Sequence, residues 1–297
     1  MKMLATFLLA LALPAAVWGT EYRFRAVDFP GAANTALYAI NDHGQFVGAE
    51  KDSAGKHHAI VGRGVRLAQL DPSGTIGTSV ESWAFSINGH GDIAGAIVDA
   101  AGANHGFVRR ASSAIELVDF PGASGTQAFG INDHGSVIGI YFDAAGKQHA
   151  FTLRHGRYQT ADLPDTLVTY PLSINNEEEI AGEAVKTPDT VGFGYLQHRG
   201  GRIELATAPG SAPEQTYFVS INNRREVLGG YFDVAGNIFN FIRRGSDYTP
   251  FDLPASFGAV YVSAQTINDR GDIVGYWFDA SFVAHGFVAR AMRDEDD

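Results

Sequence analysis

The stretch Ile131-Asn132-Asp133-His134-Gly135-Ser136-Val137-Ile138-Gly139 contains the pattern that decides the fold of this 297-residue chain. The pattern is Ile-Asn, four further residues, two apolar residues and a glycine, and it recurs at intervals of 43 to 47 residues. Its asparagines are Asn41, Asn88, Asn132, Asn175, Asn222 and Asn268. Near-even spacing of this size is typical of repeat architectures, in which each repeat is one supersecondary unit.

The third unit shows how one repeat is built. Its apolar and turn residues predict four strands, at Thr126–Ile131, Ser136–Phe142, His149–Arg154 and Arg157–Asp162. Asn132 to Gly135 form the first hairpin turn, since asparagine can cap a turn with its side chain and glycine adopts positive φ freely. Glycine fills the fourth position of this turn in most units, whereas Glu178 and Arg225 replace it in two.

The ends of the chain predict how the repeats are closed. A four-stranded sheet of about 45 residues cannot bury both faces alone, so we expect an all-β fold, a six-bladed β-propeller of four-stranded blades. The last unit ends after its third strand, His285–Met292. Tyr22–Asp28 and the following Phe29-Pro30-Gly31 match the fourth strand Ile115–Asp119 and its Phe120-Pro121-Gly122. We expect this N-terminal strand to complete the last blade, which removes an exposed sheet edge. An open all-β repeat array is the alternative.

Residues 1–19 have the pattern of a cleaved signal peptide, with Lys2 followed by the apolar run Leu4–Leu13. This run is shorter than the about 20 residues of a membrane-spanning helix. The chain contains no cysteine, which excludes disulfides and a cysteine-linked lipid anchor. We therefore expect a secreted or periplasmic protein in which residues 20–297 form a single propeller domain with the acidic tail Asp294–Asp297.

The charge of the chain restricts its partners. The formal net charge is −11 at pH 7, and such a surface repels nucleic acid and anionic lipid. We expect a monomer with no nucleic-acid partner and no membrane insertion. The acidic run Glu177–Glu179 is interpreted as solvated charge. The sequence contains no Gly-x-Ser-x-Gly, His-Glu-x-x-His or phosphate-loop motif, so the commonest enzyme signatures are absent.

His149-Ala150-Phe151, together with Ile131-Asn132-Asp133 and Gly135, resembles the repeat of the bacterial extracellular HAF-repeat proteins. The resemblance extends over the whole chain after the signal peptide. The triplets aligned with it in the other units are His58-Ala59-Ile60, His105-Gly106-Phe107, Gly192-Phe193-Gly194, Phe239-Asn240-Phe241 and His285-Gly286-Phe287. The resemblance implies export and a propeller-like β fold, and it implies no established activity.

Aspartate and histidine recur at fixed distances from the repeat asparagine. They are Asp52, Asp99, Asp143, Asp233 and Asp279, and His58, His105, His149 and His285. A metal or acid-base site is one interpretation. The two positions flank one hairpin turn, however, so a hydrogen bond that pins the turn explains both. We favour this interpretation, because one pair per blade would be spread around a ring and could not supply the ligands of one zinc ion. The asparagines are likewise interpreted as turn caps.

Ligand-binding residues are better sought where the units differ, near the loops that lead into the innermost strands. The candidates are Tyr38, Glu81, Trp83, Tyr170, Tyr217 and Tyr261. Aromatic rings stack on sugars or peptides while polar groups fix their orientation. Packing between blades is the alternative role of these rings. We expect a non-catalytic exported propeller that binds a glycan, a peptide or an extracellular protein on this face, without a cofactor.

Two other functions are kept as alternatives. Six-bladed propellers include hydrolases and lyases that hold calcium in the central channel, where an acidic residue such as Glu81 could be a ligand. A structural surface or matrix protein is the third function. Carboxylates that converge on the axis would favour the enzyme, and an aromatic-lined concavity would favour the binding protein.

Overall fold

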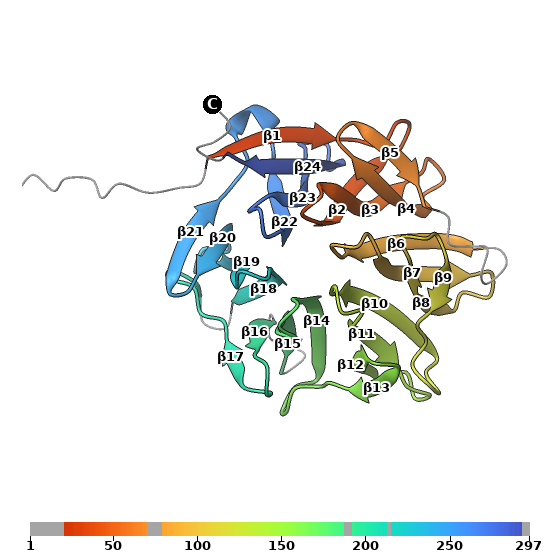
Figure 1. Cartoon of the computed structure of the whole chain (residues 1–297). Coiled ribbons are helices and arrows are strands. Elements are labelled where there is room, and N and C mark those ends of the chain that lie inside the picture. Colours follow the sequence, from red (N-terminus) through yellow and green to blue (C-terminus); the bar gives the residue numbers. More distant parts are fainter. Residues whose placement is uncertain (1–20, 71–78, 187–191, 213–214, 293–297) are drawn as a thin grey trace, which may run out of the picture.

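The chain folds into six four-stranded antiparallel sheets arranged around one central axis (Figure 1). The computed structural model describes residues 21–70, 79–186, 192–212 and 215–292. The predicted signal peptide at 1–19 and the acidic tail Asp294–Asp297 lie outside these residues. The predicted all-β six-bladed propeller is therefore confirmed, and the open repeat array is excluded. No helix among the described residues is long and apolar enough to cross a membrane.

Each blade begins with the innermost strand, which ends immediately before the repeat asparagine. Blade 1 consists of β2 (Asn34–Ile40), β3 (Gln45–Lys51), β4 (His57–Arg63) and β5 (Arg66–Gln69). Blade 2 consists of β6 (Ser79–Ile87), β7 (Ile93–Asp99), β8 (Asn104–Arg109) and β9 (Ile115–Leu117). Blade 3 consists of β10 (Gly125–Ile131), β11 (Val137–Phe142), β12 (Gln148–Arg154) and β13 (Arg157–Thr160). Blade 4 consists of β14 (Val168–Ile174), β15 (Ile180–Val185), β16 (Phe193–Gln197) and β17 (Ile203–Leu205). Blade 5 consists of β18 (Thr216–Ile221), β19 (Glu226–Phe232), β20 (Ile238–Arg244) and β21 (Asp247–Phe251).

Blade 6 joins the two ends of the described chain. It contains β22 (Tyr261–Ile267), β23 (Ile273–Phe278) and β24 (Ala284–Ala291), and its outermost strand is β1 (Tyr22–Val27). Strand β1 pairs antiparallel with β24 along its whole length, and the N–H of Met292 donates to the carbonyl of Glu21 at 2.8 Å. The predicted closure by the N-terminal strand is therefore confirmed.

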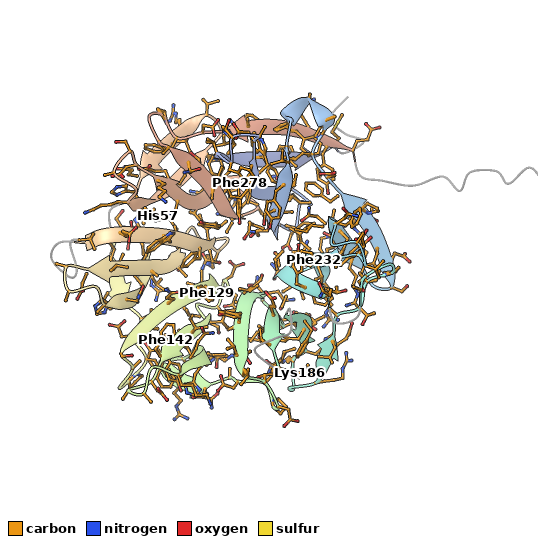
Figure 2. All side chains as sticks on the ribbon, turned by 180° about the vertical axis from the view of Figure 1, so that it is seen from behind. His57, Phe129, Phe142, Lys186, Phe232 and Phe278 are labelled. Carbon is orange, nitrogen blue, oxygen red and sulfur yellow. The ribbon has the colours of Figure 1, made fainter. Side chains whose placement is uncertain are left out.

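The glycine of the repeat pattern allows the first two strands of each blade to approach closely. A Cβ atom on Gly139 would overlap the carbonyl oxygen of Gln127 on the innermost strand. The same overlap would occur at Gly48, Gly95, Gly182, Gly229 and Gly275. Close by, the innermost strand bulges between Ala128 and Gly130, and the other five blades repeat this irregularity. Phe129, at the bulge, lies beside the central axis (Figure 2).

The first hairpin turn has one conformation in all six blades. Its fourth residue has positive φ at Gly135 (75°), and also at Glu178 (63°) and Arg225 (60°), where the sequence departs from glycine. The Oδ1 atom of Asn132 accepts the N–H groups of His134 and Ser136 at 3.1 and 3.0 Å. The predicted role of the asparagine as a turn cap is confirmed.

The triplet alignment in the fourth unit is corrected by the strand register. Gly139 pairs with Phe151 in blade 3, whereas the equivalent Gly182 pairs with Tyr195 in blade 4. The blade 4 triplet is therefore Phe193-Gly194-Tyr195, one residue later than predicted from counting. A phenylalanine thus replaces the histidine in both departing units, because Phe239 has this position in blade 5.

Apolar contacts between neighbouring blades form the core. The cluster between blades 1 and 2, for example, joins Val47 and Ala59 to Ile97 and the fully buried Phe107. At the closure, Phe24 and Tyr22 pack against Phe251 of blade 5, with ring centroids 6.1 and 5.4 Å apart. Closure of the ring therefore buries apolar surface in addition to completing a sheet.

Deletion of residues 21–27 should destabilise the propeller. Burial of Val27 contributes roughly 1.5–3 kcal/mol, and the partly buried rings of Phe24 and Tyr22 together add a similar amount, so we expect the free energy of unfolding to fall by about 5 kcal/mol, with aggregation through the exposed edge of β24. Chemical denaturation and light scattering measure both effects. Arg23→Ala, an exposed position on the same strand, is the control and should change stability by less than about 0.5 kcal/mol. Equal stability of the deleted and intact chains would disprove the role of β1.

Candidate functional site

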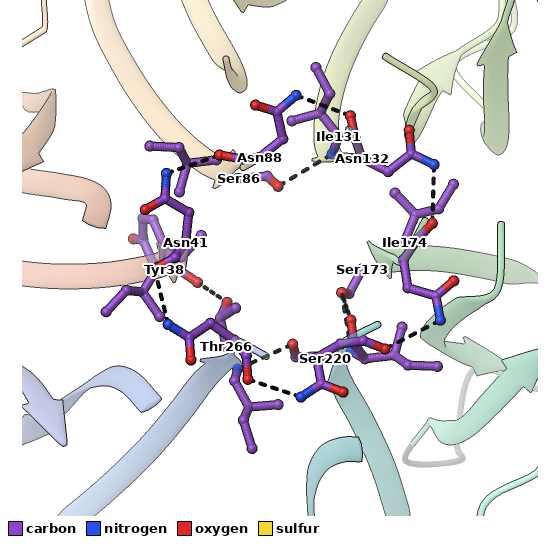
Figure 3. Close-up of a pocket in the computed structure, with 18 of the residues that line it drawn as sticks. Tyr38, Asn41, Ser86, Asn88, Ile131, Asn132, Ser173, Ile174, Ser220 and Thr266 are labelled. Carbon is purple, nitrogen blue, oxygen red and sulfur yellow. Dashed lines mark hydrogen bonds between the residues drawn. The ribbon is translucent and has the colours of Figure 1, made fainter. Parts of the chain in front are cut away.

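A pocket of 380 Å³ lies on the central axis and is lined by residues of all six innermost strands (Figure 3). We call the end at which the innermost strands begin the loop end, and the other end the asparagine end. Trp83 lines the pocket toward the loop end, and the repeat asparagines line it at the asparagine end. The pocket is the central channel of the propeller.

The six repeat asparagines form a closed ring of hydrogen bonds around the channel (Figure 3). The Nδ2 group of each donates to the backbone carbonyl of the asparagine in the next blade, at 2.9 to 3.3 Å. Asn268 donates to Asn41 and closes the circle. Because the Oδ1 atoms cap the turns, both ends of these amides are used, and no asparagine is more than 5% exposed. The asparagines therefore line the pocket because they hold the blades together, and their amide groups are not left over to bind a ligand.

A second ring follows at the next residue of each blade. The N–H of Asn176 donates to Oδ1 of Asn223 at 2.7 Å, and that of Asp269 donates to Asp42 at 2.9 Å. Gly89 interrupts this ring, because it offers no side-chain acceptor. Burial, and then the charge of nearby Asp269, raise the pKa of Asp42. Among the described residues, no group of three or more histidine, aspartate and glutamate side chains could hold a metal ion.

The bulge residues form a collar around the middle of the channel. Blades 1 to 3 contribute Tyr38, Phe85 and Phe129, whose rings follow one another with centroids 5.7 and 5.3 Å apart. Blades 4 to 6 contribute Leu172, Val219 and Gln265. Burial, and then the neighbouring Tyr276, raise the pKa of the Tyr38 phenol. One half of the collar is therefore aromatic, and the other half combines aliphatic groups with one amide.

Of the residues predicted from the sequence, Tyr38 and Trp83 line the pocket. Glu81 contacts His57 of blade 1 through the backbone N–H at 3.2 Å and through Nδ1 at 3.0 Å. Burial opposes ionisation of Glu81, but the hydrogen bonds of His57 outweigh it and lower the pKa of the carboxyl. The His57 ring packs on Trp83, with centroids 5.1 Å apart. Glu81 thus helps to position Trp83 through His57.

The other predicted residues, Tyr170, Tyr217 and Tyr261, belong to blades 4 to 6 and are not among the lining residues of the pocket. The side chain of Tyr217 lies over Gly230 on the neighbouring strand. A Cβ atom on Gly230 would overlap the hydroxyl of Tyr217. Burial raises the pKa of Tyr217, and Tyr261, Glu183 and Tyr276 raise it further because they are close. The prediction missed Glu183, which lies on the second strand of blade 4 and outside the loops considered.

The recurring aspartate and histidine pairs pin the second hairpin turn, as predicted. His58 contacts Asp52 at 3.2 Å and His149 contacts Asp143 at 3.4 Å. Three of the histidines also contact a second aspartate, at the end of the blade, which the sequence analysis did not consider: Asp119 for His105, Asp162 for His149 and Asp28 for His285. The pairs lie in separate blades, and each has a structural explanation.

The interpretation of Glu177–Glu179 as solvated charge is wrong for Glu179. Its side chain is buried and contacts Nδ1 of His198 at 3.0 Å and Nε of Arg225 in blade 5 at 2.9 Å. Glu178 accepts hydrogen bonds from Asn132 and Ser136 of blade 3. These two carboxylates therefore tie blade 4 to both of its neighbours, and Glu177 alone is exposed.

The fold resembles those of several solved propellers. AofleA from Arthrobotrys oligospora matches with a TM-score of 0.55 at 14% identity, over 95% of this chain and 89% of that chain. The fucose-specific lectin from Aleuria aurantia matches with a TM-score of 0.52 at 11% identity, over 93% and 100%. TolB from Acinetobacter baumannii matches with a TM-score of 0.53 at 10% identity, over 84% and 64%. Such low identities establish a shared fold alone. Neither the family models nor the curated proteins give a match.

Asn132→Ala should weaken the ring. It removes the bond to the carbonyl of Asn175 and leaves the capped N–H groups of blade 3 without their acceptor, so we expect a loss of about 2–3 kcal/mol of unfolding free energy. Urea denaturation measures it. Asn237→Ala, an exposed turn position, is the matched control and should cost less than about 0.5 kcal/mol. Equal losses in the two variants would disprove the structural importance of the ring.

His105→Gln should destabilise the protein more at about pH 5 than at about pH 9. Burial disfavours the charged ring, but hydrogen bonds with Asp119 and Asp99 outweigh it and raise the pKa of His105. A raised pKa stabilises the fold fully below the unfolded value of about 6.5, and this contribution is lost as pH rises through the folded pKa.

Because His105 is partly exposed, we expect a difference of a few tenths of a kcal/mol between the two pH values. Denaturant unfolding of wild type and variant at both pH values measures it. His90→Gln, an exposed turn position, is the control and should show no such difference. A loss in His105→Gln that does not change with pH would contradict the ion-pair interpretation.

Proposed function

We propose that this protein is an exported, non-catalytic propeller that binds a glycan at the loop end of its central channel. The observation that supports it best is the position of Trp83, which lines the channel pocket next to the aromatic half of the collar. A partly exposed indole ring offers a flat apolar face to a sugar ring, and its N–H can bind a hydroxyl. His57 and Glu81 hold this ring from behind.

The chemistry of the opposite wall also supports a glycan. Gln265 lines the pocket, and its Nε2 group donates to Ser263 at 2.8 Å, which fixes the direction of the amide. A few oriented polar groups that face aromatic rings are typical of sites for small polar ligands. A pocket of 380 Å³ is large enough for one or two sugar rings of a longer chain. A short peptide remains the alternative ligand.

The comparison with known structures gives this proposal a precedent. The Aleuria aurantia lectin, which has the same fold, is described as fucose-specific. The precedent is one of fold analogy, since function depends on the site. Export rests on the N-terminal signal pattern, and the resemblance to the HAF-repeat proteins rests on the repeat triplets.

Trp83→Ala should lower glycan affinity at least about tenfold, because one stacked aromatic ring and the apolar area it covers are lost. A glycan array that includes fucosides identifies the ligand, and calorimetry then compares wild type and variant. Phe282→Ala, an aromatic position that is 77% exposed on the turn before β24, is the control and should bind like wild type. An array on which wild type binds no glycan, or a ligand that Trp83→Ala binds unchanged, would refute the proposal.

A further inference from the structure

Glu183 departs from the repeat at a position where the other blades have no charge. It follows the repeat glycine on the second strand, and the equivalent residues in the other blades are Ala49, Ala96, Ile140, Gly230 and Tyr276. Its cross-strand partner on the innermost strand is Tyr170. Cross-strand partners project from the same face of a sheet, so the carboxyl lies on the face of blade 4 from which Tyr170 projects. Of the six equivalent positions around the propeller, the one in blade 4 thus carries the only carboxylate.

The described residues around Glu183 leave room for its carboxyl group but supply no hydrogen-bond donor to it. A Cβ atom on Gly192 would overlap Oε1 of Glu183, so the glycine makes the space that the carboxyl occupies. Among the described residues, no group donates a hydrogen bond to it. Burial alone raises the pKa of Glu183. A partly buried carboxylate without a partner is unfavourable for folding, and a ligand that supplies a donor would remove the penalty.

Tyr217 of blade 5 lies beside this part of blade 4, because a Cβ atom on Gly194, the cross-strand partner of Glu183, would meet the Tyr217 backbone. Glu183, Tyr261 and Tyr276 are all close enough to Tyr217 to influence its titration. Tyr276 is engaged with Ser263, which in turn accepts from Gln265. In the described part of the chain, the phenol groups of Tyr217 and Tyr261 have no hydrogen-bond partner. Blades 4 to 6 therefore contribute one carboxyl and two unengaged phenols just outside the residues that line the channel pocket, and blade 5, which carries Tyr217, lies opposite blade 2, which carries Trp83 (Figure 1).

We propose that Glu183, with the phenols of Tyr217 and Tyr261, forms a subsite for a sugar that carries a free amine. This inference rests on the proposed glycan-binding function and names the class of sugar. A protonated amine makes a charge-assisted hydrogen bond to the carboxylate, about twice as strong as a neutral one. The faces of tyrosine rings attract the same cation. The net charge of −11 also favours a cationic over an anionic ligand.

Calorimetry with a tetramer of glucosamine and with its fully N-acetylated counterpart tests the subsite. We expect wild type to bind the free-amine tetramer at least about tenfold more tightly, because acetylation removes the charge. Glu183→Gln should abolish this preference by weakening the amine form about tenfold while it leaves the acetylated form within about twofold. Glu177→Gln, an exposed position in the same blade, is the control and should keep the wild-type preference.

The results separate this inference from the proposed function. Loss of the amine preference in Glu183→Gln, with a melting temperature no lower than that of wild type, supports the subsite, because a neutral amide costs less to bury than a carboxylate. An unchanged preference in that variant, or no binding of the free-amine tetramer by wild type, overturns it. If wild type still binds another glycan and Trp83→Ala loses it, the proposed function stands and only the subsite is wrong.

Discussion

The closed ring of asparagine hydrogen bonds is the interaction on which the rest of this propeller depends. Each asparagine holds its own hairpin turn through Oδ1 and the next blade through Nδ2, so a single residue type connects local and global structure. The chain has no disulfide to close the circle. The bond from Asn268 to Asn41 and the pairing of β1 with β24 close it without a covalent bond. A cycle of buried hydrogen bonds in which every member is satisfied is expected to stabilise one arrangement of the blades.

The sequence predicted the fold because the repeat encodes the backbone. Each part of the repeat pattern has a local role that can be recognised in the sequence. The asparagine caps the hairpin turn, the fourth residue of the turn adopts positive φ, and the repeat glycine allows two strands to approach closely. The ring itself was not predicted, since the target of Asn132 Nδ2 is a carbonyl 43 residues away, and its position depends on how blades stack. The same limit explains Glu179, which looks solvated within its own unit but meets Arg225 of the next blade.

The candidate site was only partly predictable, for a reason of register. The bulge in each innermost strand decides which side chains turn toward the axis, and a shift of one residue reverses the faces of a strand. Tyr38 is at a bulge and lines the pocket. Trp83, two residues before the bulge of its strand, also lines the pocket. Glu183 was missed because the search covered only the loops and the innermost strands. The signal was present in the sequence, since Glu183 follows the glycine of the repeat pattern at a position where the other units have uncharged residues.

The constraints on the backbone also explain how the site can be asymmetric within a symmetric frame. Asparagine, glycine and bulge hold the main chain of all six innermost strands in the same path, so the side chains between them can differ without cost to closure. Blades 1 to 3 present the aromatic half of the collar and Trp83 to the channel, and blades 4 to 6 present Leu172, Val219 and Gln265, with Glu183 and the tyrosine phenols outside the pocket lining. A ligand on the axis would meet an apolar wall and a polar wall at once. Such a pair of walls fits a sugar ring, which has flat apolar faces and a polar rim.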